Sequence, residues 1–175
     1  MGAMDDETLT RVRALLDRDA LSACVLAYAR GLDRVDEELI LSAFHPDGIF
    51  DNGNMRGSPR AFVDWLFPQQ EGRDMVQHFV TNSTFELDGD TAHGETYFLA
   101  VIGWVGRTSL DLMGGRYLDR FECRDGRWGI AVRVLVRDWH FSAEKEVASE
   151  FLDRGLHLTT RDRRDVSYLR PLESP

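Results

Sequence analysis

The chain has 175 residues, 43% of them hydrophobic and 10% aromatic, which fits one globular domain with a substantial core. Its formal net charge of -9 disfavours nucleic acids and anionic membrane surfaces as partners, because binding to either depends on clustered Lys and Arg. No apolar run approaches the roughly 18 to 20 residues that a membrane-spanning helix needs.

The first helical pattern covers residues 6–32, where apolar residues recur every three or four positions. We expect one long amphipathic helix there, or two helices with a break near Asp19. Gly31 is expected to end the pattern, because glycine accepts the left-handed conformation at a helix C-terminus. Tyr28 and Asp33 lie about 140° apart on an ideal helix, so they converge only if the helix ends or bends at Gly31.

Two shorter helices are expected next. Residues 36–44 have a helical pattern that a turn at residues 45–48, His-Pro-Asp-Gly, would close. A short strand would begin at residues 49–51, and residues 52–54, Asn-Gly-Asn, would form a further turn. Ser58 and Pro59 then provide the N-cap and the first turn of a helix that runs to about Phe67.

The chain after Gly72 is rich in strand patterns. Two Asp-Gly dipeptides, Asp88-Gly89 and Asp125-Gly126, mark tight hairpin turns because they fit positive φ angles. Helices followed by long antiparallel strands are typical of an α+β domain in which the helices pack on one face of a strongly curved sheet. The expected strands cover residues 75–87, 91–105, 109–123 and 127–141.

The first of these strands contains His78. With a period of two, His78 lies between Val76 and Val80 on one strand face, together with Asn82. A histidine with apolar neighbours is either a core residue with one satisfied nitrogen or lines a cavity in which its near-neutral pKa is useful. The other face of the strand would carry Phe79, Thr81, Phe85 and Leu87.

Four short motifs connect the chain to a known family. They are Tyr-Ala-Arg-Gly-Leu-Asp at residues 28–33, His-Pro-Asp-Gly at 45–48, Gln-His-Phe-Val-Thr-Asn at 77–82 and Asp-Gly-Arg-Trp at 125–128. Through these motifs, residues 8–141 resemble the SnoaL-like proteins of the nuclear transport factor 2-like superfamily. The resemblance implies a cone-shaped α+β barrel with a deep apolar pocket. It also implies likeness to cofactor-free enzymes such as scytalone dehydratase, bile-acid dehydratase and hexachlorocyclohexane dehydrochlorinase.

The same resemblance implies roles for four residues. The aspartate that orients the catalytic histidine in those enzymes matches Asp33, and the histidine itself matches His78. A tyrosine of some dehydratases matches Tyr28, and an arginine of the last strand matches Arg133. A further acidic or histidine residue that some dehydratases use has no clear match, and the candidates are Glu95, Tyr97 and Asp111.

These four residue types suit proton abstraction beside a carbonyl group. An imidazole held by a carboxylate is a base near neutral pH, a phenol can donate a hydrogen bond to a developing enolate, and a guanidinium can stabilise negative charge. Each residue also has a structural alternative. Asp33 could bind loop amides, Tyr28 could be a core tyrosine, and Arg133 could pair with a carboxylate.

The leading functional hypothesis is a cofactor-independent lyase or isomerase that acts on a small apolar cyclic substrate such as a polyketide, steroid or terpenoid. The alternatives are a non-catalytic small-molecule-binding protein of the same fold, or a protein-interaction module. No metal or nucleotide cofactor is expected, because the histidines lack metal-type spacing and no Gly-rich phosphate loop follows a strand. Cys24 and Cys123 lie far apart in the sequence, and a reducing cytoplasm is the expected compartment.

Residues 1–142 are expected to form the SnoaL-like domain, and residues 143–175 a short helix near 144–152 and a tail that covers the pocket mouth. A homodimer or homotrimer is expected as well. The outer face of the sheet, with Phe79, Phe85 and Leu87, would otherwise expose a large apolar patch.

Overall fold

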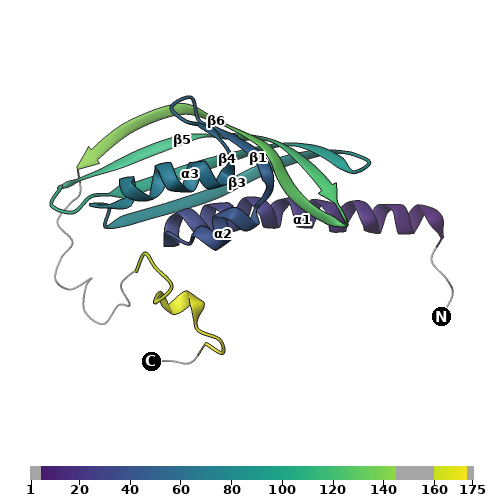
Figure 1. The fold of residues 1–175 in the computed structure, drawn as a ribbon, viewed down its shortest axis with the longest axis horizontal. Coiled ribbons are helices and arrows are strands. Elements are labelled where there is room, and N and C mark those ends of the chain that lie inside the picture. The colour runs from purple at the N-terminus through teal and green to yellow at the C-terminus, as the bar shows by residue number, and fades with distance from the viewer. Residues whose placement is uncertain (1–4, 145–159, 173–175) are drawn as a thin grey trace.

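The computed structural model describes residues 5–144 and 160–172, in which helices pack against one sheet (Figure 1). The helices come first and the long strands follow, as the sequence pattern predicts. The helices are α1 (Asp6–Arg34), α2 (Glu37–Ser42) and α3 (Pro59–Leu66), with 3-10 helices η1 (Phe67–Gln70) and η2 (Val166–Tyr168). The strands are β1 (Phe44–Asp51), β2 (Arg56–Gly57), β3 (Met75–Asp88), β4 (Thr91–Gly103), β5 (Ser109–Arg124) and β6 (Arg127–Glu144).

The described strands form one mixed sheet in the order β2-β1-β6-β5-β4-β3. β1 runs parallel to β6, and all the other neighbouring strands are antiparallel. In Figure 1 the sheet arches over α1 and α2. The α+β class and the curved, mostly antiparallel sheet that we expected are therefore confirmed, and the sheet is open rather than closed.

The helix α1 is continuous, without a break near Asp19. The carboxylate of Asp5 caps its first turn by accepting a hydrogen bond from the Thr8 amide at 2.7 Å. Only the second half of α1 is covered by the sheet, and its buried residues include Leu21, Cys24, Val25 and Tyr28. The part of α1 that packs against the rest of the protein thus begins near Leu21 and ends beside β3.

Gly31 does not end α1, contrary to our expectation. The helix continues to Arg34, and Val35 adopts the left-handed conformation with a φ of 49°. Gly31 instead allows α2 to approach α1, because a Cβ atom there would lie 2.6 Å from Ile40 Cγ1 and 2.8 Å from the Ile40 amide nitrogen. The added helical residues keep Asp33 within the last turn of α1, where it faces β3.

The short helices are capped as predicted. Asp36 accepts a hydrogen bond from the Leu39 amide, and Ser58 accepts one from the Ala61 amide. The turn predicted at residues 45–48 is wrong, because these residues belong to β1. The register between β1 and β6 is irregular there, which accommodates the proline and the glycine within the strand.

The two hairpins differ in their turn residues. Between β3 and β4 the turn is formed by Gly89 and Asp90, and Gly89 has a φ of 57°. Between β5 and β6, Asp125 and Gly126 have φ angles of 53° and 76°, as expected for an Asp-Gly turn.

A register shift in β3 overturns one prediction about the faces of the sheet. The pairing between β3 and β4 shifts between Val80 and Ser83, so the alternation of side chains changes beyond that point. Phe79 lies on the outer face and is 44% exposed, whereas Phe85 and Leu87 pack against the core. The outer apolar face therefore does not include Phe85 or Leu87.

A buried ion pair lies at the centre of the core. The side chains of Arg133 on β6 and Asp119 on β5 are both fully buried. The carboxylate of Asp119 accepts hydrogen bonds from Arg133 Nε at 2.7 Å and Nη2 at 2.6 Å. The guanidinium also lies 4.3 Å from the ring centroids of both Tyr28 and Tyr117. The carboxylate and the two aromatic rings together offset the cost of burying this cation.

Asp119→Asn should destabilise the protein strongly, because it leaves Arg133 charged, buried and without a counterion. We expect the free energy of unfolding, measured by urea denaturation, to fall by about 3–5 kcal/mol. The double variant Asp119→Leu/Arg133→Met removes both charges and should lose less. A loss in the single variant that is no larger than in the double variant would contradict the importance of the pairing.

Candidate functional site

The side chains of Asp33 and His78 form a close pair between the end of α1 and the start of β3. Nδ1 of His78 lies 2.7 Å from Oδ1 of Asp33. The backbone amide of His78 also donates to both carboxylate oxygens, each at 3.1 Å. The two side chains are only 10% and 16% exposed. One carboxylate thus fixes both the position of the strand at His78 and the orientation of the imidazole ring.

His78 opens onto a cavity of about 350 Å³ between the sheet and the helices. Most of its wall is apolar, including Leu32, Phe50, Trp65, Val76, Ile102 and Met113. Its polar wall comprises Asn52, Asn54, Gln69, Gln70, Arg73 and Arg137 in addition to His78. The size and mixed lining suit a small ring-containing organic molecule.

Tyr28 forms part of the same wall and belongs to the aromatic core. Its ring packs edge-on against Tyr117, with centroids 5.5 Å apart, and stacks near Phe62 at 6.0 Å. Burial raises the pKa of the Tyr28 hydroxyl, while the positive charge of Arg133 acts in the opposite direction. The phenol therefore keeps its proton at neutral pH and can act as a hydrogen-bond donor.

Arg133 is placed differently from the other three predicted site residues. It lies behind the ring of Tyr28 and is absent from the cavity wall. Its hydrogen bonds go to Asp119, and its Nη1 has no hydrogen-bond partner within the described part of the chain. The structure therefore places His78 and Tyr28 on the cavity wall, with Asp33 bound to His78 and Arg133 packed against the Tyr28 ring, both outside the wall itself.

The three further candidates do not line the cavity. Glu95 and Tyr97 both lie near Arg116, which is 3.7 Å from the Glu95 carboxylate. Asp111 accepts hydrogen bonds from Trp104 at 2.7 Å and from Ser142 at 2.6 Å.

Several polar residues of the cavity wall were not predicted from the sequence. Arg137 could have been predicted from the alternation of side chains along β6. It lies four residues after Arg133 and two after Leu135, so the three side chains share one face of the strand. Asn52 and Asn54 were interpreted only as turn residues. Gln70 and Arg73 lie in η1 and in the connection before β3, where no strand or helix period indicates which way a side chain points.

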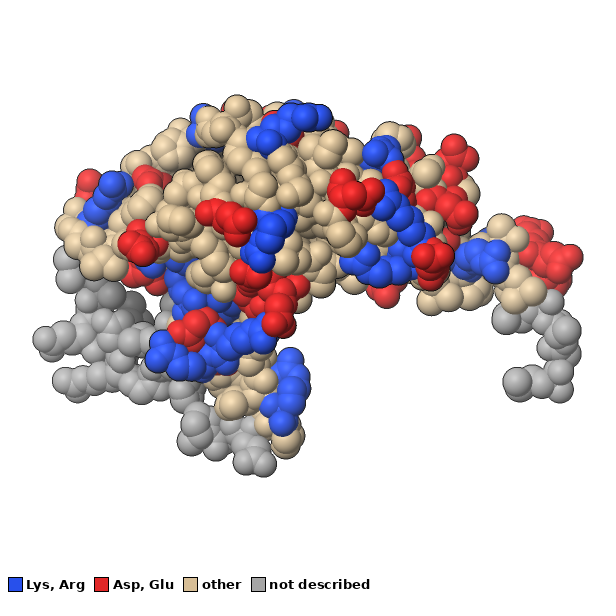
Figure 2. All heavy atoms as spheres, in the orientation of Figure 1, with Lys and Arg blue, Asp and Glu red and all other residues tan. Residues whose placement is uncertain are grey.

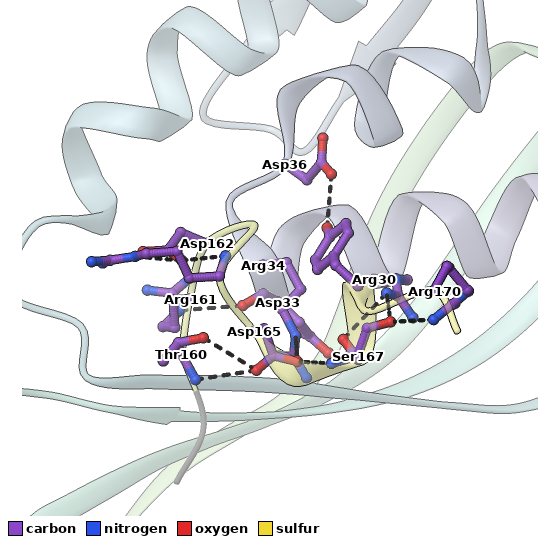
Figure 3. Close-up of polar contacts among 12 residues, drawn as sticks. Arg30, Asp33, Arg34, Asp36, Thr160, Arg161, Asp162, Asp165, Ser167 and Arg170 are labelled. Atoms are coloured by element: carbon purple, nitrogen blue, oxygen red, sulfur yellow. Dashed lines mark hydrogen bonds and ion pairs between the residues drawn. The ribbon is translucent and has the colours of Figure 1, made fainter. Parts of the chain in front are cut away.

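The C-terminal segment 160–172 packs beside the end of α1 and the start of α2 (Figure 3). Arg161 donates to the backbone carbonyl of Leu32 at 3.3 Å and of Asp33 at 3.4 Å. It also donates to the carbonyl of Arg73 at 3.3 Å and to Oε1 of Gln70 at 2.8 Å. One arginine therefore ties the segment to the end of α1 and to two residues of the cavity rim.

Further contacts hold the same segment against α1 and α2. Asp165 is buried, lies 3.3 Å from Nε of Arg34 and accepts a hydrogen bond from the Ser167 amide. Hydrogen bonds from Ser167 lower the pKa of Asp165 to about 2, so this carboxylate is charged at neutral pH. Tyr168 donates to Asp36 at 2.7 Å. Figure 2 shows Lys and Arg atoms gathered where this segment meets the helices.

The helix expected near residues 144–152 falls almost wholly outside the described residues, and Glu144 itself ends β6. Among the described residues, no helix is long and apolar enough to cross a membrane. Within the same part of the chain, no group of three or more His, Cys, Asp or Glu side chains is arranged to hold a metal ion.

Comparison with solved structures shows the same fold in several proteins of low sequence identity. A hexachlorocyclohexane dehydrochlorinase of type 2 matches with a TM-score of 0.71 and 18% identity, over 86% of this chain and 97% of that one. The type 3 enzyme from Novosphingobium barchaimii gives 0.69 and 17%, over 86% and 99%. A proposed scytalone dehydratase from Novosphingobium aromaticivorans gives 0.66 and 18%, over 77% and 91%.

Comparison with curated protein sequences finds no match. Among family models, the SnoaL-like domain matches residues 13–134, from within α1 to the first half of β6. This stretch is well over half of the chain and contains Asp33, His78 and most of the residues that line the cavity. The protein therefore belongs to the SnoaL-like family, within the nuclear transport factor 2-like superfamily.

Proposed function

We propose that the protein is a cofactor-independent lyase or isomerase that acts on a small, largely apolar, ring-containing substrate. The observation that carries this proposal is the Asp33–His78 pair at the wall of a mainly apolar cavity. A histidine that serves only to fill a core has no need of a carboxylate that binds both its ring and its backbone amide. Family membership supports the proposal, since dehydratase-type and isomerase-type chemistry fits this fold.

In this proposal His78 is the general base. Its Nδ1–H donates to Asp33, which leaves the lone pair on Nε2 to accept a proton. Nε2 takes a proton from a carbon beside a carbonyl group, and the electron pair of the broken C–H bond forms an enolate. The enolate then either expels a leaving group from the neighbouring carbon or regains a proton at a different carbon. Asp33 offsets the charge of the imidazolium in both cases.

Tyr28 is the proposed hydrogen-bond donor to the enolate oxygen or to the leaving group. Its raised pKa keeps the hydroxyl protonated, as this role requires. Arg133 was expected to stabilise negative charge directly. Because it lies 4.3 Å from the Tyr28 ring and pairs with Asp119, we propose that it acts through Tyr28 by fixing that ring in place.

A non-catalytic binding protein is the second candidate function. The position of Arg133 favours it, because the guanidinium expected beside the reacting group is fully buried and committed to Asp119. The same cavity would then hold a small organic ligand without turning it over. The exchange experiment described below distinguishes the two functions.

We also propose a homodimer or homotrimer in the cytoplasm. The outer face of the sheet has a cluster of half-exposed aromatic residues, which a partner copy would cover. They are Phe79, Tyr97, Trp139 and Phe141, with exposed fractions between 40% and 52%. Cys24 and Cys123 are both free thiols, as is usual for proteins of reducing compartments.

The segment 160–172 is proposed to stabilise the rim of the cavity as part of a C-terminal extension to the domain of residues 1–142. Its contacts with Gln70 and with the Arg73 carbonyl join it to residues that line the cavity. Closing or stiffening such a rim helps to exclude water from the reacting groups.

His78→Ala should slow proton abstraction by a factor on the order of 10² to 10⁴, because a positioned base is removed. The measurement is hydrogen–deuterium exchange at the acidic carbon of a bound cyclic ketone, followed by NMR. Asp33→Asn should have a smaller effect of the same kind, and His93→Ala, at an exposed position, should have none. If the folded His78→Ala variant binds the ketone and exchanges it as fast as wild type, the binding-protein function is favoured.

Arg161→Met should weaken binding of the same ketone by roughly tenfold, because the rim loses its charge-assisted hydrogen bonds to the segment. Calorimetry measures the affinity, and amide exchange should become faster in residues 70–73 and 160–168. Arg164→Met is the matched control, since Arg164 is 86% exposed and, of the residues that the structure describes, its side chain pairs only with Asp162. Equal affinity in both variants would show that the segment does not influence the cavity.

Light scattering at low micromolar concentration should give the mass of a dimer or trimer. Trp139→Asp, on the outer face, should shift the protein towards the monomer, because it places a charge within the apolar interface. Glu7→Lys, which also changes a charge but lies at the exposed start of α1, serves as control. A monomer mass for the unaltered protein would refute the proposed assembly.

A further inference from the structure

We propose that the cavity binds an anionic group, a carboxylate, at Arg73 and Arg137, so that the substrate is a ring compound with an acidic end. This inference rests on the proposed function only in taking the cavity to be a small-molecule site. It adds a recognition element to a wall that is otherwise mainly apolar. The inference rests on the burial and incomplete hydrogen bonding of Arg73 and on the position of Arg137 in the same wall.

Arg73 is a half-buried cation whose hydrogen bonding is incomplete. Its Nε is buried and has no hydrogen-bond partner within the described part of the chain. Among the described residues, its one side-chain hydrogen bond goes to Gln70 Oε1 at 3.4 Å, near the upper limit for such a bond. The guanidinium also lies 5.1 Å from the ring centroid of Trp104. Burial lowers the pKa of Arg73, and the more distant charge of Asp111 acts in the opposite direction.

Arg137 is the second cation of the wall. It shares a face of β6 with Leu135, which also lines the cavity. In the part of the chain that the structure describes, Arg137 forms neither a hydrogen bond nor an ion pair. Arg137 is exposed, so its N–H donors face solvent and are accessible to a ligand.

Two acidic residues near the cavity are hydrogen-bonded to residues other than Arg73 and Arg137. Asp33 binds His78, and Asp111 binds Trp104 and Ser142. Arg161 adds a third positive charge beside Arg73. Burial, and then the charge of Arg73, lower the pKa of Arg161 to about 10, although Asp33 and Asp74 act in the opposite direction. A chain of net charge -9 thus concentrates positive charge at the rim of its cavity.

A carboxylate bound beside Arg73 would supply the partner that its Nε lacks. It would accept a hydrogen bond from that nitrogen, its planar shape matches a guanidinium group, and the positive charge of Arg137 in the same cavity wall would stabilise it further. The amide side chains of Asn52, Asn54 and Gln69 on the same wall can complete its coordination. The rest of the ligand would occupy the apolar part of the cavity, which extends to His78.

The test compares 1-naphthaleneacetate with 1-naphthaleneacetamide, followed by a panel of other ring carboxylates with their primary amides. Each pair has the same ring and nearly the same shape but differs in charge. Calorimetry should show binding of the carboxylate about tenfold tighter than that of the amide. In NMR spectra, the Nε–Hε signal of Arg73 should shift with the carboxylate and much less with the amide.

Arg73→Met and Arg137→Met should each remove most of this preference while leaving amide binding nearly unchanged. Arg18→Met removes the same charge from an exposed part of α1 and should keep the preference. Equal affinity of acid and amide for the wild-type protein, or a preference that survives loss of both arginines, would overturn the inference. If no member of either series binds, the cavity is not a small-molecule site and the proposed function falls with the inference.

Discussion

A single carboxylate at the end of a helix holds the functional part of this protein together. Asp33 binds the ring of His78 at 2.7 Å and its amide nitrogen with both oxygens. These bonds join α1 to β3, an edge strand of the sheet, at the point where the two elements enclose the cavity. The close packing of α2 on Gly31 fixes the end of α1, and the Asp33 carboxylate is held in place because its backbone belongs to that last turn.

The buried Arg133–Asp119 pair performs a related task in the core. A charged pair in the interior is costly unless its geometry is good, and here the carboxylate binds two guanidinium nitrogens while the rings of Tyr28 and Tyr117 each lie 4.3 Å from the guanidinium. Tyr28 is one of these rings and also forms part of the cavity wall. The contact between Arg133 and the Tyr28 ring therefore both fills the core and orients the Tyr28 hydroxyl.

Much of the architecture could be predicted from the sequence, because helix caps, hairpin turns and periodicity are local. The long strands are an example, whereas the pairing of Asp33 with His78, 45 residues apart, was implied by the family resemblance and not by a local pattern. Phe85 and Leu87 were placed on the wrong face, since a one-residue bulge in β3 leaves no mark in the alternation of residue types. Arg133 was named as a site residue, but its complete burial and its pairing with Asp119 were not predicted. Both depend on how β5 and β6 align, which the alternation of residue types along one strand does not reveal. Arg73 could not be placed, because its connection has no period.

The charged groups in and beside the cavity wall favour one orientation of a bound ligand. The carboxylate of Asp33 lies beside the imidazole, whereas Arg73 and Arg137 supply the positive charge of the wall. An acidic ligand is attracted to the arginines and repelled by Asp33, and both effects are strong where water is scarce. A position of the acidic end beside the arginines is therefore favoured over one beside Asp33. Since the remainder of the wall is mainly apolar, the ring is the part of the ligand left to face His78, and one orientation is selected before any proton moves.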